Sequence, residues 1–158
     1  MKVVLCFGSN LGDREQLIQE AVRRMESIGS LLCVSSLYET APWGFDSPYP
    51  FLNQVAIYSS TWAPQLILQK CLETEAILGR ERTGKQYASR TMDIDILFYD
   101  SLVIETDELI LPHPRLHLRN FVLFPLQEVL PDFIHPIYQK TISVLLAESM
   151  DTSPCVKK

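Results

Sequence analysis

Residues 90–99 read Arg-Thr-Met-Asp-Ile-Asp-Ile-Leu-Phe-Tyr, and the fold of the chain is best approached from this stretch. Its apolar residues alternate along the chain: Met92, Ile94, Ile96 and Phe98. A period of two predicts a β-strand that buries one of its faces. Asp93 and Asp95 must then share the opposite face, with their Cα atoms about 7 Å apart.

Two carboxylates on one strand face carry a cost that a ligand can remove. At a separation of about 5 Å and an effective dielectric near 20, they repel by roughly 3 kcal/mol. A bound divalent cation would offset this repulsion, and Mg²⁺ prefers carboxylate oxygens. Four basic residues stand just upstream: Arg80, Arg82, Lys85 and Arg90. Carboxylates beside guanidinium groups, which match phosphate geometry, favour phosphoryl or nucleotidyl chemistry over two aspartates that merely face solvent.

Hydrophobic patterns on either side of this strand predict the other elements. Further strands are expected at 3–7, 33–39 and 51–60, with short extended pieces at 102–104 and 109–111. Helices are expected at 13–28, 64–78, 121–130 and 141–148. The order β-α-β-β-α-β predicts an α+β, ferredoxin-like (split βαβ) core, a mostly antiparallel sheet with its helices on one face.

The helix predicted at 64–78 carries an unusual acidic residue. Its apolar face is expected to consist of Leu68, Cys71, Leu72 and Leu78. Glu75 falls on the same face, where an ionised carboxylate is costly to bury. Glu75 must therefore lie at the rim of the core or have a specific partner.

Composition narrows the class of protein. The chain has 158 residues and a formal net charge of −5, and 47% of its residues are hydrophobic, which predicts one domain over residues 1–158. The acidic balance argues against a nucleic-acid partner, and no apolar run is long enough to span a membrane. The four cysteines lack metal-site or disulfide-scaffold spacing. We expect a cytoplasmic monomer that acts on small molecules, with a flexible tail at about 151–158.

Three short stretches partly match known ligand-binding motifs, and each has a simpler interpretation. Residues 79–86 nearly match a phosphate-binding P-loop, but Gln86 replaces the Ser or Thr ligand and the order is helix then strand. Gly8-Ser9-Asn10 is either an anion-binding turn or a plain strand-to-helix turn. His113 and His117 lack a third zinc ligand, so phosphate or ribose contact suits His113 better.

The loop between Thr40 and Phe51 is long and rich in aromatic residues and prolines. Such a loop is too long for a tight hairpin, and functional loops often have this character. Trp43 and Phe45 within it could stack on a flat ligand.

Ordered motifs across nearly the whole chain resemble those of the 6-hydroxymethyl-7,8-dihydropterin pyrophosphokinases of the folate pathway. The motifs, in order along the chain, are Gly8-Ser9-Asn10-Leu11, Ser35-Ser36-x-Tyr38-x-Thr40-x-Pro42-x-Gly44, Phe51-Leu52-Asn53, Glu75-x-x-x-Gly79-Arg80-x-Arg82, Arg90-Thr91-x-Asp93-x-Asp95-Ile96, Leu111-Pro112-His113 and Arg119-x-Phe121-Val122-Leu123-x-Pro125-Leu126.

This resemblance implies transfer of the β,γ-diphosphate of ATP to the pterin hydroxymethyl group, with release of AMP. It implies that Asp93 and Asp95 hold two Mg²⁺ ions, and that these two residues act in catalysis with Arg80 and Arg90. It implies contacts to ATP from Glu75, Arg82, Ile96, Leu109, Ile110, His113 and Arg119. It implies a pterin stacked between Phe51 and Phe121, with its polar edge read by Asn53 and by Thr40, Pro42 and Trp43.

Two other classes stay open on the residues themselves. A nucleotidyltransferase with a D-x-D pair would release pyrophosphate in place of AMP. A non-catalytic ferredoxin-like ligand-binding domain would bind a small molecule without turnover.

Overall fold

The computed structural model of the chain describes residues 1–80 and 89–158. Its strands are β1 (Lys2–Ser9), β2 (Gly29–Val34), β3 (Tyr38–Thr40), β4 (Phe51–Ser60), β5 (Asp93–Tyr99), β6 (Ile104–Glu105), β7 (Ile110–Leu111) and β8 (Cys155–Lys157). Its α-helices are α1 (Arg14–Met25), α2 (Pro64–Ile77), α3 (Asn120–Val129) and α4 (Ile142–Ala147), and short 3₁₀ helices are η1 (Glu26–Ile28) and η2 (Leu116–Leu118). No helix within the described ranges has both the length and the apolar character needed to cross a bilayer.

The main sheet has the predicted ferredoxin-like arrangement. Its strand order is β5-β1-β4-β3-β8, and β2 also pairs with β4. All these pairs are antiparallel. Strand β1 lies between β5 and β4 and pairs with β4 along its whole length, from Lys2 opposite Ser59 to Ser9 opposite Leu52. The β-α-β-β-α-β order predicted from the sequence is found, except that its second strand is divided into β2 and β3.

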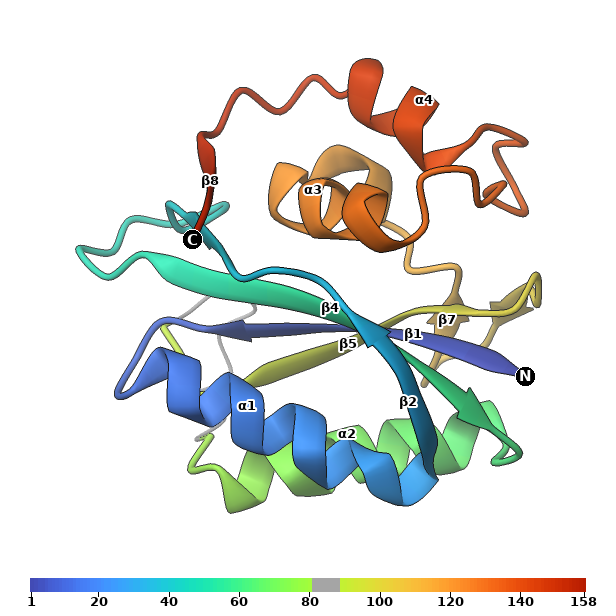
Figure 1. Cartoon of the computed structure of the whole chain (residues 1–158), viewed down its shortest axis with the longest axis horizontal. Coiled ribbons are helices and arrows are strands. Elements are labelled where there is room, and N and C mark those ends of the chain that lie inside the picture. The colour runs from blue at the N-terminus through green and yellow to red at the C-terminus, as the bar shows by residue number, and fades with distance from the viewer. Residues whose placement is uncertain (81–88) are drawn as a thin grey trace.

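Helices cover both faces of this sheet, so the prediction of helices on one face is wrong (Figure 1). Helices α1 and α2 pack on one face, where Val3, Leu5 and Phe7 of β1 join their core. Helices α3 and α4 cover the other face, where Val4 and Cys6 belong to a second core. A central strand that is apolar on both sides requires a covering layer on each.

Strand β5 changes phase within its length. Ile96 lies opposite Leu5 and Phe98 opposite Val4, so Leu97 is an additional residue, a β-bulge. Before the bulge, Met92, Ile94 and Ile96 pack under α1 and α2 as predicted. After the bulge, Phe98 packs toward α3 and α4. The prediction that Phe98 shares a face with Met92, Ile94 and Ile96 is therefore wrong.

The two helices of the split βαβ unit begin and end as their sequences indicate. The Asp13 side chain caps α1 by accepting a hydrogen bond from the Gln16 amide at 3.1 Å. Pro64 opens α2, and Gly79 follows it with φ +84°, a conformation that suits glycine. Leu72 is 43% exposed and Ile67 is buried in its stead, because the buried row of α2 runs through Ile67, Cys71, Thr74 and Glu75.

Two segments differ from prediction because side chains form hydrogen bonds with main-chain amides of other elements. The strand expected at 33–39 is broken at Ser35, whose hydroxyl accepts a hydrogen bond from the Val55 amide at 3.0 Å. The flexible tail expected at 151–158 is instead ordered. Asp151 accepts a hydrogen bond from the Asn120 amide at the start of α3 at 2.8 Å, and β8 pairs with β3.

Candidate active site

A cavity of about 200 Å³ opens on the α3 face of the sheet. It is bounded by β1, the segment after β3, the first residues of β4, the start of β5 and the chain from His113 to Phe121. Its lining residues are Cys6, Gly8, Thr40, Ala41, Trp43, Phe45, Phe51, Asn53, Arg80, Arg90, Asp93, Asp95, His113, Arg115, Arg119 and Phe121. Segments far apart in the sequence therefore meet around the two aspartates of β5.

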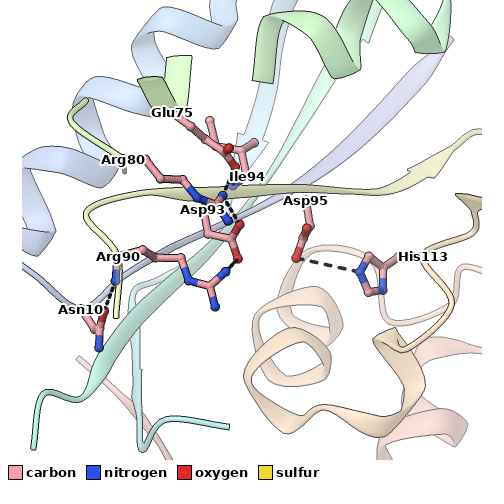
Figure 2. A network of polar contacts seen from close by, with 8 residues as sticks. All are labelled: Asn10, Glu75, Arg80, Arg90, Asp93, Ile94, Asp95 and His113. Atoms are coloured by element: carbon pink, nitrogen blue, oxygen red, sulfur yellow. Dashed lines mark hydrogen bonds and ion pairs between the residues drawn. The ribbon is translucent and has the colours of Figure 1, made fainter. Parts of the chain in front are cut away.

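Asp93 is held by two arginines, one on each carboxylate oxygen (Figure 2). Arg80 Nη1, just beyond the end of α2, lies 2.6 Å from Asp93 Oδ1. Arg90 Nη1 lies 2.9 Å from Asp93 Oδ2. Charge-assisted bonds of this length hold both guanidinium groups at the mouth of the D-x-D strand.

Glu75 anchors this group from below. It is 3% exposed, and its Oε1 accepts hydrogen bonds from the Ile94 amide at 2.8 Å and pairs with Arg80 Nη1 at 2.6 Å (Figure 2). Glu75 therefore has specific partners, which include the Ile94 amide near the start of β5 and the Arg80 guanidinium. Glu75 does not line the cavity.

Asp95 has far fewer partners than Asp93 among the described residues. His113 Nε2 lies 3.9 Å from its Oδ2, which is too long for a hydrogen bond. Burial, and then the nearby Asp93 carboxylate, raise the pKa of Asp95 to about 7. The Asp93 carboxylate therefore disfavours the charge of Asp95, in the direction that the sequence predicted.

His113 is uncharged at neutral pH. Burial, together with the positive charges of Arg119 and Arg115, lowers the pKa of His113 to about 4. Nδ1 of the neutral ring accepts a hydrogen bond from the Arg115 amide at 3.2 Å, so Nε2, on the side of Asp95, carries the proton, and the ring supplies no charge to the site.

Aromatic rings form the wall opposite the carboxylates. The edge of Phe45 meets the Phe51 ring with centroids 6.2 Å apart, and the Arg90 guanidinium lies 5.8 Å above Phe51. The Arg119 guanidinium lies 4.6 Å from the Trp43 ring and 5.5 Å from the Phe121 ring. Planar groups thus stack here before any ligand is present.

Arg119 and Asn53 complete the polar part of the cavity. Arg119 is buried, and within the described ranges its Nε has no hydrogen-bond partner. The Asn53 amide donates to Thr40 Oγ1 at 2.9 Å, which fixes its orientation and leaves its Oδ1 beside Gly8. A buried donor without a partner is costly unless a ligand satisfies it.

Most of the predicted site residues meet in this cavity. They are Arg80, Arg90, Asp93, Asp95, His113, Arg119, Thr40, Trp43, Phe51, Asn53 and Phe121. Pro42 stands between two lining residues. Ile96 and Leu109 are instead buried in the core under α1 and α2, while Ile110 is exposed on β7. Arg82, with Lys85, lies outside the described residues.

Cys6 and Ala41 line the cavity without having been predicted. A signal for Cys6 existed: it is the β1 residue opposite Asp95, but this follows only from the register of β1 and β5. Ala41 carries no chemical signal of its own.

The donor set fits Mg²⁺ shared with a ligand. In the part of the chain that the structure describes, no group of three or more His, Cys, Asp and Glu side chains could hold a metal ion unaided. Two mutually repelling carboxylates in a cavity are nevertheless the oxygen donors that Mg²⁺ prefers, and Mg²⁺ commonly takes its remaining ligands from water and substrate phosphates.

Comparisons with known proteins agree with this geometry. The sequence model of the 7,8-dihydro-6-hydroxymethylpterin-pyrophosphokinase (HPPK) family matches residues 4–131. A 2-amino-4-hydroxy-6-hydroxymethyldihydropteridine pyrophosphokinase of Porphyromonas gingivalis is 44% identical over 138 residues, covering 85% of this chain and 93% of the relative. A protein of the same name from Aquifex aeolicus is 39% identical over 147 residues, covering 93% and 91%.

Solved structures share the fold at low sequence identity. A crystal structure of wild-type Plasmodium falciparum HPPK-DHPS matches 93% of this chain with a TM-score of 0.73 and 15% identity. This chain spans only 44% of that longer protein, so the likeness concerns the fold of one part of it. The family match over residues 4–131 and the identities to the two bacterial relatives are decisive: the chain belongs to the 7,8-dihydro-6-hydroxymethylpterin-pyrophosphokinase family.

Proposed function

We propose that this pyrophosphokinase of folate biosynthesis transfers the β,γ-diphosphate of ATP to the hydroxymethyl group of 6-hydroxymethyl-7,8-dihydropterin and releases AMP. One observation carries the proposal. A single cavity joins a carboxylate pair, two positioned guanidinium groups and several aromatic rings. This combination suits the transfer of a charged group to a flat acceptor.

Asp93 and Asp95 are the residues that would hold two Mg²⁺ ions. When bound, these ions would supply positive charge to phosphate oxygens. The raised pKa of Asp95 supports this assignment, because a neighbouring cation favours the ionised form that coordination requires.

Arg80 and Arg90 would bind the diphosphate that is transferred. Both are paired with Asp93, at 2.6 and 2.9 Å, so their guanidinium groups lie at the carboxylate pair. A guanidinium fork matches two phosphate oxygens, and catalysis of this kind depends on such preset charge. Arg119, whose buried Nε has no hydrogen-bond partner among residues 1–80 and 89–158, would contact another phosphate oxygen.

Phe51 and Phe121 would hold the pterin ring between them. Both line the cavity, and each already lies within 6 Å of a guanidinium. Asn53, oriented by Thr40, would read the polar edge of the ring together with the main chain of Pro42 and Trp43.

The remaining nucleotide contacts are proposed on the family resemblance. They comprise Arg82, His113, Ile96, Leu109, Ile110 and Glu75. Because the side chains of Ile96 and Leu109 are buried in the core, any contact that they make with the nucleotide would use their main chains. Glu75 would act through Arg80, which it holds at 2.6 Å.

We propose that the chain works as a monomer. We place it in the cytoplasm, since all four cysteines are free thiols.

The fate of the β-phosphate tests the proposal. Mg-ATP labelled at the β-phosphate is incubated with the hydroxymethyl dihydropterin, and the products are separated. We expect AMP to form in a one-to-one ratio with a labelled pterin diphosphate. Label in ADP would mean a simple kinase, and label in free pyrophosphate a nucleotidyltransferase. Binding without any turnover would leave the ligand-binding alternative.

A further inference from the structure

Asn10 occupies the junction of the two segments that flank the cavity. It follows the end of β1, is 2% exposed and does not line the cavity itself. Its contacts reach the aromatic segment at residues 47–49 and the end of the basic segment at residues 89–90. These segments lie about forty residues from each other in the sequence and touch different proposed substrates.

Asn10 fixes the main chain of Arg90 on both sides. Its Oδ1 accepts a hydrogen bond from the Arg90 amide at 2.7 Å, and its own amide donates to the Arg90 carbonyl at 3.1 Å (Figure 2). The Arg90 side chain then points to Asp93. The direction of this guanidinium therefore depends on Asn10.

The same side chain holds the aromatic segment. Asn10 Nδ2 donates to the Tyr49 carbonyl at 3.1 Å and to Ser89 Oγ at 3.0 Å. Ser89 Oγ in turn lies 3.1 Å from Ser47 Oγ. One buried carboxamide uses both of its N–H groups and its oxygen to join residues on the two segments.

We propose that Asn10 is a positioning residue that couples the nucleotide and pterin sites. When a ligand holds the Arg90 guanidinium in its place beside Asp93, the shared carboxamide also restrains residues 47–49, which precede Phe51. The second substrate then binds to a segment that is already ordered, and thermodynamic linkage makes the effect equal in both directions. This inference rests on the proposed function for the identity of the two ligands, but the link between the segments is a property of the ligand-free protein.

Two variants separate coupling from folding. Asn10→Asp keeps the size and the acceptor for the Arg90 amide, but turns a carboxylate oxygen toward the Tyr49 carbonyl. Asn10→Ala removes all three side-chain contacts. Ser60→Ala is the matched control, because Ser60 is also buried and joins two segments: it donates to the Ile28 carbonyl at 2.6 Å and accepts from the Trp62 amide at 3.1 Å. Ser60 is the last residue of β4, whereas Phe51, which lines the cavity, is the first, so the length of the strand separates Ser60 from the cavity.

The main measurement is the affinity for the pterin by calorimetry, with and without Mg and α,β-methylene-ATP. The ratio of the two affinities is the coupling factor, and we expect it to fall at least about fivefold in both Asn10 variants, since typical couplings are 5- to 150-fold. Ser60→Ala should lower the melting temperature and leave the ratio unchanged. A ratio that stays at the wild-type value in Asn10→Asp would overturn the inference while leaving the proposed function intact.

A ligand-free measurement keeps the inference separate from the proposed function. Hydrogen exchange of the apo-protein should quicken in residues 41–50 and in the peptide containing residues 89–90 together in Asn10→Asp, but in neither in Ser60→Ala. If the wild type forms no AMP, the proposed function fails and the exchange result alone decides the role of Asn10. Faster exchange in one segment only would reject the coupling.

Discussion

Two carboxylates of similar exposure, Asp95 and Glu128, show how differently the same group is used on one face of the sheet. The side chain of Asp95 is 35% exposed and that of Glu128 is 28% exposed. Glu128, on α3, accepts hydrogen bonds from Tyr38 Oη at 2.6 Å and from the hydroxyl and amide of Ser36 at 2.9 and 3.2 Å. For Asp95, the contact given among the described residues is His113 Nε2, at 3.9 Å.

Their pKa values move in opposite directions. Burial raises the pKa of Asp95 to about 7, and Asp93 adds to the effect. Burial would also raise the pKa of Glu128, but hydrogen bonds from Tyr38 and Ser36 outweigh it and hold that pKa below its ordinary value. A carboxylate whose lone pairs the protein satisfies stabilises the fold, whereas one left short of donors is available to a ligand.

The largest expected effect comes from removing the carboxylates at the cavity. Asp93→Ala or Asp95→Ala should slow AMP formation more than 100-fold, roughly 3 kcal/mol in the barrier, because the proposed Mg²⁺ ligands are lost. The melting temperature of Asp95→Ala should not fall. Near-wild-type turnover at ordinary Mg²⁺ would remove the metal assignment and, with it, this side of the comparison.

The two phenylalanines of α3, Phe121 and Phe124, should show the same division between a side chain that binds a ligand and one that stabilises the fold. Phe121→Ala should weaken pterin binding by about 1–3 kcal/mol, by analogy with stacking of bases on aromatic rings, and leave ATP affinity nearly unchanged. Phe124 instead packs near Tyr38, with ring centroids 6.4 Å apart. Phe124→Ala should therefore lower stability and spare pterin affinity. Calorimetry with each substrate, beside thermal unfolding, measures both; an unfolded Phe121→Ala protein would show that its ring belongs to the core.

Glu128→Gln should cost stability in place of activity. Leaving the donors of Tyr38 and Ser36 with a weaker acceptor should lower the free energy of unfolding by about 1–2 kcal/mol at pH 7. Because the folded pKa of Glu128 lies below the unfolded value, its contribution is present above the unfolded pKa and is lost as pH falls through the folded pKa. The difference between variant and wild type should thus vanish in acid. A loss of turnover in a stable variant would contradict the division.

A comparison of opposite sign comes from the carboxylate of Asp95, through the pH dependence of the stability of Asp95→Asn in metal-free buffer. Its folded pKa, near 7, lies above the unfolded value, so ionisation of Asp95 costs the wild type stability as pH rises from about 4 to 7. The variant should gain on the wild type across this window and keep the advantage above it. Denaturant unfolding with EDTA at several pH values checks the sign, which is opposite to that of Glu128.

Local patterns predicted much of this molecule. The alternation in β5, the Asp13 cap and the Pro64 start of α2 are each encoded within a few residues, and all are found in the structure. The pairing of the acidic strand with Arg80 and Arg90 was also visible, because these residues lie near one another in the sequence.

Features that depend on distant partners could not be read in the same way. The second helical layer has a local sign in the continuous apolar run of β1, which needs cover on both faces, whereas the ordering of the tail depends on Asp151 meeting the start of α3. Asn10 joins segments near residues 49 and 89, and no spacing in the sequence reveals such a contact. Cys6 reaches the cavity only through the β1–β5 register.

The alternation of charged and apolar residues in β5 also protects the fold against an error of assembly. A slip of one residue against β1 would turn Asp93 and Asp95 into the apolar layer under α1 and α2, which now holds Ile94 and Ile96. Burying two unpaired carboxylates in that layer would be strongly unfavourable. The side chains proposed to bind the metal thus also disfavour the misregistered pairing of β5 with β1.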